Sequence, residues 1–118
     1  MFDAVVTAGA MMACADRPAA ASERSEFATF VGHSPWMPTF TASDAAEAFD
    51  SRVRQFEMVG GDLDREMGSL RQVSDDIGIG EVVRVCELVA MADGRLQPAE
   101  VQVLRDVRSA MGRPLIGD

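Results

Sequence analysis

The fold of this chain is decided by residues 79–92, IGEVVRVCELVAMA. Placed on a helix, this stretch has apolar side chains on nearly every face, which is typical of a helix enclosed by others. A second stretch of the same kind, residues 4–15 with the sequence AVVTAGAMMACA, lies close to the N-terminus. Two buried helices need a common core, so we expect a fold built around both of them.

Two amphipathic helices are predicted between these stretches. The first covers residues 21–31 and ends at Gly32, because glycine commonly follows the last residue of a helix. The second follows a capping Thr41 or Ser43 and carries apolar residues at helical spacing on one side. On its opposite side we expect an ion pair between two residues four apart, Asp50 and Arg54.

The second half of the chain adds a helix on either side of the apolar stretch. We expect one to begin at Asp62, and residues 75–78 to interrupt the chain after it. The last helix begins at Pro98 and ends at Gly112, since proline suits a first helical position and glycine a helix end. No stretch shows the alternation of a strand, so the sequence predicts an all-α fold.

Composition narrows the classes of function. The 118 residues include 19 acidic and 11 basic ones, and the resulting formal charge of −8 makes nucleic acid an unfavourable partner. All basic residues are Arg, which excludes Schiff-base catalysis and the Lys of a phosphate-binding loop. The apolar run at residues 4–15 is too short to span a bilayer and follows an acidic residue, so neither a signal peptide nor membrane insertion is expected.

The potential metal ligands with nitrogen or sulfur are few. One His (His33) and two Cys (Cys14 and Cys86) cannot form a four-ligand zinc cluster or a disulfide framework. Both thiols lie in apolar helical stretches, where a free Cys acts as a small buried hydrophobe. This usage suits a reducing compartment such as the cytoplasm.

An internal repeat relates the two ends of the chain. At an offset of 77 residues, Ala15-Asp16 falls on Ala92-Asp93 and Glu23 falls on Glu100. Each copy consists of an apolar helix, a short loop that begins with Asp, and an amphipathic helix. We therefore expect a compact single domain over residues 1–118 with about six to seven helices, in which two helix–loop–helix units form a pseudo-two-fold pair around the two buried central helices.

The repeated acids suggest a cation site. The loop after Ala92 matches the later half of an EF-hand loop, but the first half is missing, so binding by this loop alone is rejected. If the two units pair, carboxylates from both loops meet, and we expect a shared site for Ca²⁺, Mg²⁺ or Zn²⁺. Its ligands would be Asp93 and Glu100 as primary ones, with Asp16 and Glu23 as secondary ones.

A metal-free interpretation of the same acids stays open. Asp at a loop start and Glu in the first turn of a helix both favour the local geometry without any ion. The first loop also carries Arg17 and Pro18 where the second has Gly94 and Arg95, which places a positive charge close to the supposed site.

The second loop and its flanks resemble a known family. Residues 85–94, VCELVAMADG, together with Glu100 are similar to the TerB family of tellurite-resistance proteins, whose members carry an Ala-Asp-Gly loop followed by a Glu-initiated helix near each end of the domain. The segment 49–70 resembles the family's middle helices, so the resemblance covers nearly the whole chain. No catalytic motif comes with it.

The resemblance implies a function as well as a fold. It implies an all-helical domain with an acidic surface that binds divalent metal, a cytoplasmic role in tellurite resistance or a related stress response, and a TerC-like integral membrane protein as partner. Longer members carry a basic leader. Because this sequence begins almost at the first buried helix, we expect no contact made through such a leader.

Two function classes therefore remain. The first is a regulatory domain that binds a hard cation. The second is a metal-free adaptor whose partner docks on an apolar patch near Trp36, Met37 and Phe40, although Trp36 in a proline-rich connector is first of all expected to plug the core. An enzyme is the weakest option, because His33 has no nucleophile at a recognisable spacing and is expected to be a surface or capping residue.

Overall fold

The computed structural model consists of helices joined by short connections, and it describes residues 2–15, 21–59, 68, 70, 71, 73, 75–92 and 98–111. Five helices have defined bounds in this part of the chain: α1 Phe2–Ala13, α2 Ala21–His33, α3 Ala42–Val59, α5 Asp76–Ala90 and α6 Pro98–Ala110. No strand occurs among the described residues. The all-α prediction is therefore confirmed.

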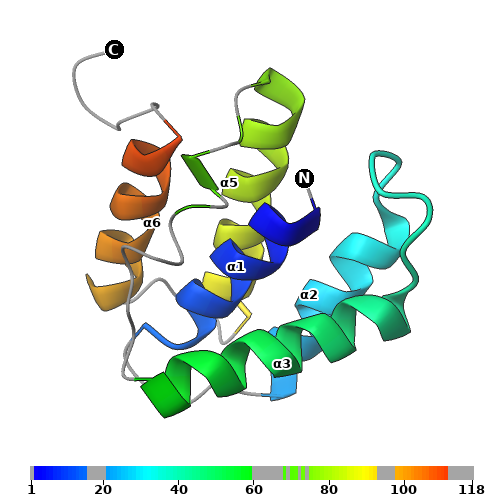
Figure 1. Cartoon of the computed structure of the whole chain (residues 1–118), viewed down its shortest axis with the longest axis horizontal. Coiled ribbons are helices and arrows are strands. Elements are labelled where there is room, and N and C mark those ends of the chain that lie inside the picture. The colour runs from blue at the N-terminus through cyan, green and yellow to red at the C-terminus, as the bar shows by residue number, and fades with distance from the viewer. Residues whose placement is uncertain are drawn as a thin grey trace.

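Helix α1 lies at the centre of this arrangement. It packs against α3, α5 and α6, while α2 packs against α3 and α5 (Figure 1). All of its residues from Ala4 to Ala13 are buried, including Thr7 and Gly9. The predicted enclosure of the first apolar helix is confirmed, because no face of it is left for solvent.

The radius of gyration is 12.9 Å, close to the value of about 13 Å typical of a compact chain of this length. None of the helices in the described part combines the length and the apolar character needed to cross a membrane.

Two predicted helix ends are wrong. Helix α2 continues through Gly32 to His33, and Gly32 instead lies against α3, where an added Cβ would come 3.2 Å from the Ala42 Cβ. Helix α5 begins at Asp76, so Gly78 lies inside it. Asp75 is its N-cap, because its carboxylate accepts a hydrogen bond from the Gly78 N–H at 3.2 Å. Asp75, which was expected to interrupt the chain, therefore caps the N-terminus of α5.

The predicted cap of α3 is confirmed, but its ion pair is not. Thr41 Oγ1 accepts from the Asp44 N–H at 3.0 Å, and the Asp44 carboxylate accepts from the Thr41 N–H at 3.1 Å. Asp50 does not pair along its own helix with Arg54. It accepts from Arg24 Nε at 2.9 Å and 3.0 Å, and so joins α3 to α2.

The number of helices differs from the prediction of six to seven, since five have defined bounds in the described residues. The helix expected from Asp62 falls largely outside them, although Leu70 is helical and fully buried. The helix bounds themselves repeat at the offset of the sequence: α1 ends at Ala13 and α5 at Ala90, while α2 begins at Ala21 and α6 at Pro98. The two-fold relation between the units stays a prediction.

Gly9 offers a direct test of this packing. A Cβ at this position would lie 2.8 Å from Cδ2 and 2.9 Å from Cε2 of Phe27, whose buried ring stacks on Phe49. We expect Gly9→Ala to lower the free energy of unfolding by about 1–3 kcal/mol, measured by urea denaturation. Gly80→Ala is the matched control, because no atom lies within 4 Å of its Cβ position, and it should raise stability by about 0.5–1 kcal/mol. Equal effects of the two variants would contradict the close α1–α2 contact.

Candidate functional site

The structure places two of the four predicted ligands at equivalent positions. Glu23 is the third residue of α2 and Glu100 is the third residue of α6, and the side chains of both are only 1% exposed. Asp16 and Asp93, the other two, lie outside the described residues. The two acids that match in the sequence repeat are thus also buried to the same extent.

A buried carboxylate at the start of a helix has a physical reason. The first turn has N–H groups without partners in the helix, and its dipole favours negative charge. Burial of a charge also requires polar partners, and neither Glu23 nor Glu100 is without an interaction. The same position therefore suits the metal-free interpretation as well as a ligand.

The first acid has a further neighbour. The thiol of Cys14, which follows α1, has its pKa raised to about 11, first by burial and then by the negative charges of Glu57 and Glu23. The end of α1, the first turn of α2 and the last turn of α3 thus lie within electrostatic range of one another. A thiol with so high a pKa is protonated at neutral pH and is a poor metal ligand and nucleophile.

The described residues do not complete a metal site by themselves. Within 2–15, 21–59, 75–92, 98–111 and the isolated positions between, no group of three or more His, Cys, Asp or Glu is placed to hold an ion. The first turns of α2 and α6 also lie apart in Figure 1, at the lower middle and the lower left of the molecule. A cation that takes about six to eight oxygens would need Asp16 or Asp93, waters and loop carbonyls in addition.

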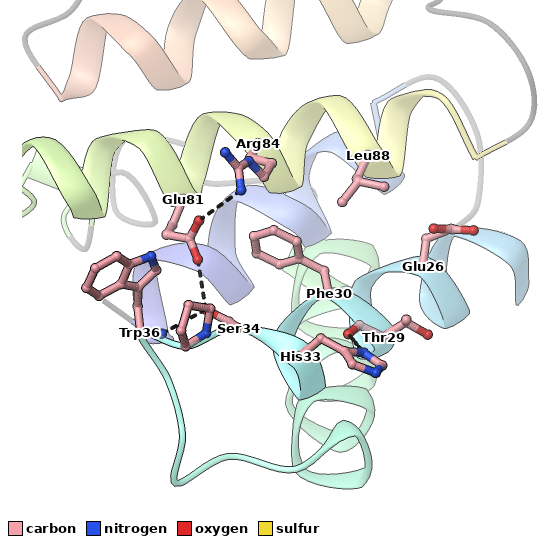
Figure 2. A pocket seen from close by; sticks show the side chains of 10 residues that line it. Glu26, Thr29, Phe30, His33, Ser34, Trp36, Glu81, Arg84 and Leu88 are labelled. Carbon is pink, nitrogen blue, oxygen red and sulfur yellow. Dashed lines mark hydrogen bonds and ion pairs between the residues drawn. The ribbon is translucent and has the colours of Figure 1, made fainter.

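A second candidate site is a groove between α2 and α5. It has a volume of about 530 Å³ and opens between the C-terminal half of α2, the connector that follows, and the exposed side of α5 (Figure 2). Phe30 and Leu88 line it from the two helices, and Trp36 and Arg84 line it farther toward the start of α5. Apolar and charged groups thus share one concave surface.

A buried hydrogen bond holds the wall of this groove. Ser34 Oγ donates to Glu81 Oε1 at 2.8 Å, and the same Ser34 Oγ accepts from the Trp36 N–H at 3.3 Å (Figure 2). Arg84 lies on the solvent side of Glu81, with its Nη1 4.0 Å from Oε2. The backbone of the connector, up to Trp36, is therefore held to α5 through Ser34.

The residues that the sequence suggested for docking differ in their exposure to solvent. Trp36 does not plug the core, since its side chain is 52% exposed. Met37 fills that role instead and is buried, and Phe40 is partly buried because its ring stacks on Phe2 with the centroids 3.7 Å apart. His33 is exposed at the end of α2, where its Nδ1 donates to the Thr29 carbonyl oxygen at 2.9 Å. It is the capping residue that the sequence predicted.

The part of the groove that α5 contributes was missed. The even spread of apolar residues made α5 look enclosed, yet Ile77, Arg84 and Met91 are exposed. A signal was present, because these three residues follow one another at intervals of seven and so share one side of a helix.

These observations define a class: a small, acidic, all-helical domain with buried carboxylates at two helix starts and an exposed groove beside a central helix. Among protein-family models, the one described as "Tellurite resistance protein TerB" matches residues 2–114. The chain therefore belongs to the TerB family, as the resemblance indicated. Searches of the curated proteins and of the solved structures found no match.

The two buried thiols predict the alkaline stability of the domain. Burial raises the pKa of Cys86 to about 12, with a smaller effect of Glu87, from an ordinary value of 9.0. Because the folded state disfavours the thiolate, the free energy of unfolding keeps its full value below pH 9 and falls as the pH rises toward 12. The sequence has no Lys and no Tyr, so no other side chain titrates between these limits.

We therefore expect the free energy of unfolding to fall above pH 9 by up to about 1.4 kcal/mol per pH unit for Cys86. Urea denaturation at several pH values measures the slope. The variant Cys14→Ala/Cys86→Ala should show a nearly flat profile over this range. A slope in the double variant as steep as in the wild type would contradict the buried placement of the thiols.

The bond between Ser34 and Glu81 gives a separate prediction. Ser34→Ala removes the hydrogen-bond donor of a buried carboxylate, and we expect a loss of about 1–3 kcal/mol in urea denaturation. Ser51→Ala, at an exposed position of α3, is the matched control and should stay within about 0.5 kcal/mol of the wild type. A Ser34→Ala variant with an unchanged free energy of unfolding would mean that this hydrogen bond does not hold the connector to α5.

Proposed function

We propose that this TerB-family domain acts in tellurite resistance or a related stress response as a non-enzymatic module that binds a divalent cation through its acidic loops. One observation carries the proposal. Glu23 and Glu100 occupy the same position of two helices whose starts are 77 residues apart, and both are 1% exposed. A helix start accounts for an acid at this position but does not by itself require the burial that both acids share, because first-turn carboxylates also act favourably at the surface.

The chemistry of the donors favours a hard cation. Asp93 and Glu100 would be the primary ligands, and Asp16 and Glu23 the secondary ones. Carboxylate oxygens suit Ca²⁺ and Mg²⁺, whereas a Zn²⁺ site prefers His or thiolate ligands. Here the His lies exposed in the groove at the other end of α2, and the pKa of the Cys14 thiol is raised to about 11.

Pseudo-two-fold pairing of the two units is part of this proposal. It is supported by the matching bounds of α1 with α5 and of α2 with α6. The packing is consistent with it as well, because each amphipathic helix contacts the central helix of the other unit, α2 against α5 and α6 against α1. A pairing of this kind brings the C-terminal ends of the central helices, from which both loops start, to the same part of the core.

Membership of the family also motivates two further proposals. A TerC-like integral membrane protein is the partner that the family suggests, and the cytoplasm is the corresponding location. The absence of Lys and the net charge of −8 favour a protein contact over nucleic acid.

A metal-free adaptor is the second candidate function. It is favoured by the groove between α2 and α5, where an exposed Trp36 stands beside Phe30 and Leu88. Exposed aromatic side chains at a concave apolar surface are typical of protein contacts.

Calorimetric titration with Ca²⁺, Mg²⁺ and Zn²⁺ tests the cation proposal. We expect heat of binding and a rise of the melting temperature for at least one hard cation, because an ion that binds only the folded state stabilises it. Asp93→Asn should weaken binding about tenfold or more, since one charged ligand is lost. Glu47→Gln is the matched control, because it removes one negative charge at an exposed position of α3, and it should leave the affinity within about twofold.

Two results would contradict this proposal. The first is the absence of both heat and stabilisation with all three cations. The second is an equal weakening by the two variants, which would indicate screening of the overall charge rather than a site.

A further inference from the structure

The exposed side of α5 carries more apolar surface than a solvated helix needs. Ile77 in its first turn is 43% exposed and Met91 at its C-cap is 52% exposed. Arg84 and Leu88 lie between them on the same side, because positions three, four or seven apart share a face. We call this side, from Ile77 through Arg84 and Leu88 to Met91, the α5 strip; it extends for about 20 Å along the helix.

The α5 strip and the groove form one surface. Arg84 and Leu88 belong to both, and across the groove stand Phe30 of α2 and Trp36 of the connector. In Figure 2, Trp36 lies toward the start of α5 and Leu88 lies toward its end. Trp36, Ile77 and Met91 are the large apolar side chains that are exposed in the described part of the chain. Trp36 lines the groove, and Ile77 and Met91 are the two ends of the α5 strip.

The charges around this surface restrict its occupant. Glu26 lines the groove from α2, Glu81 lines it from α5, and Glu87 is exposed beside Leu88. Arg84 is the opposing cation, but its Nη1 lies 4.0 Å from the Glu81 carboxylate, whose charge it offsets. The chain as a whole carries −8. A second copy of this chain is therefore repelled, and a basic partner is attracted.

We propose that the α5 strip and the groove bind a basic amphipathic helix of a partner protein. Apolar side chains at i, i+3 or i+4, and i+7 of that helix would lie on Phe30, Trp36 and Leu88, and its Lys or Arg residues would face Glu26 and Glu87. A strip of about four helical turns matches a helix laid in a groove, which is a common mode of peptide recognition. The proposal rests on the adaptor candidate and does not depend on the cation.

Trp36 makes the proposal directly measurable. It is the single Trp of the chain, and half of its side chain is exposed in the free protein. A peptide without Trp that covers the groove would shift the emission of Trp36 to shorter wavelength, because the indole leaves water. The probe is a Leu/Lys peptide of about 16 residues with amphipathic helical spacing, titrated into the full chain. A scrambled peptide of the same composition and a Leu/Glu peptide of the same pattern are its controls.

A pair of variants with equal charge change locates the binding. Glu26→Lys reverses a charge in the groove, and Glu47→Lys reverses one at an exposed position of α3. We expect Glu26→Lys to weaken the binding of the Leu/Lys peptide about tenfold, and Glu47→Lys to weaken it about twofold or less. Binding should be the same in chelator and in Ca²⁺, so a failure of the cation proposal leaves this one standing, and the reverse also holds.

Several outcomes would overturn the proposal. They are no shift of the Trp36 emission, equal binding of the scrambled or Leu/Glu peptide, equal effects of the two variants, and a shift that anionic phospholipid vesicles produce and the peptide does not. A shift that grows with protein concentration alone, together with a dimer in sedimentation, would identify a second copy as the occupant instead.

Discussion

Complete enclosure of α1 determines how the other helices are arranged. A helix whose residues 4–13 are all buried has no face for solvent, so α3, α5 and α6 must surround it. Removal of this apolar surface from water provides the main driving force, and Gly9 permits a close approach of the Phe27 ring. Helix α2 packs against α3 and α5 and covers only part of α5, so Ile77 and Met91 remain exposed.

This arrangement also explains where the polar groups lie. Glu23 and Glu100, in the first turns of α2 and α6, are buried, and Glu23 lies within electrostatic range of the Cys14 thiol at the end of α1. Glu81, on α5, is buried where the connector after α2 closes over it, and its bond to Ser34 satisfies the carboxylate. Among the described residues, the buried acids thus serve two places: Glu81 fixes a wall of the groove, and Glu23 and Glu100 lie at the starts of α2 and α6, beside the loops for which we propose a cation.

Much of the fold could be predicted from the sequence, and less of the site. The apolar character of residues 4–15 and the proline at position 98 predicted α1 and the start of α6 correctly, because such local signals are strong. Asp75 and Gly32 were misjudged since the same residue types serve as caps, breakers or close contacts, and tertiary packing decides among them. The partner of Asp50 is likewise a residue on another helix, Arg24, which periodicity along one helix does not reveal.

We propose that the acidic loops bind a divalent cation. Residue-resolved NMR during a titration with Ca²⁺ or Mg²⁺ tests it most directly, because each backbone amide reports on its own surroundings. We expect saturable shifts confined to residues 13–23 and 90–100, with the amide of Trp36 unchanged. Shifts spread evenly over exposed acids, or none in either loop at saturating cation, would contradict it and leave the domain as a helical docking module.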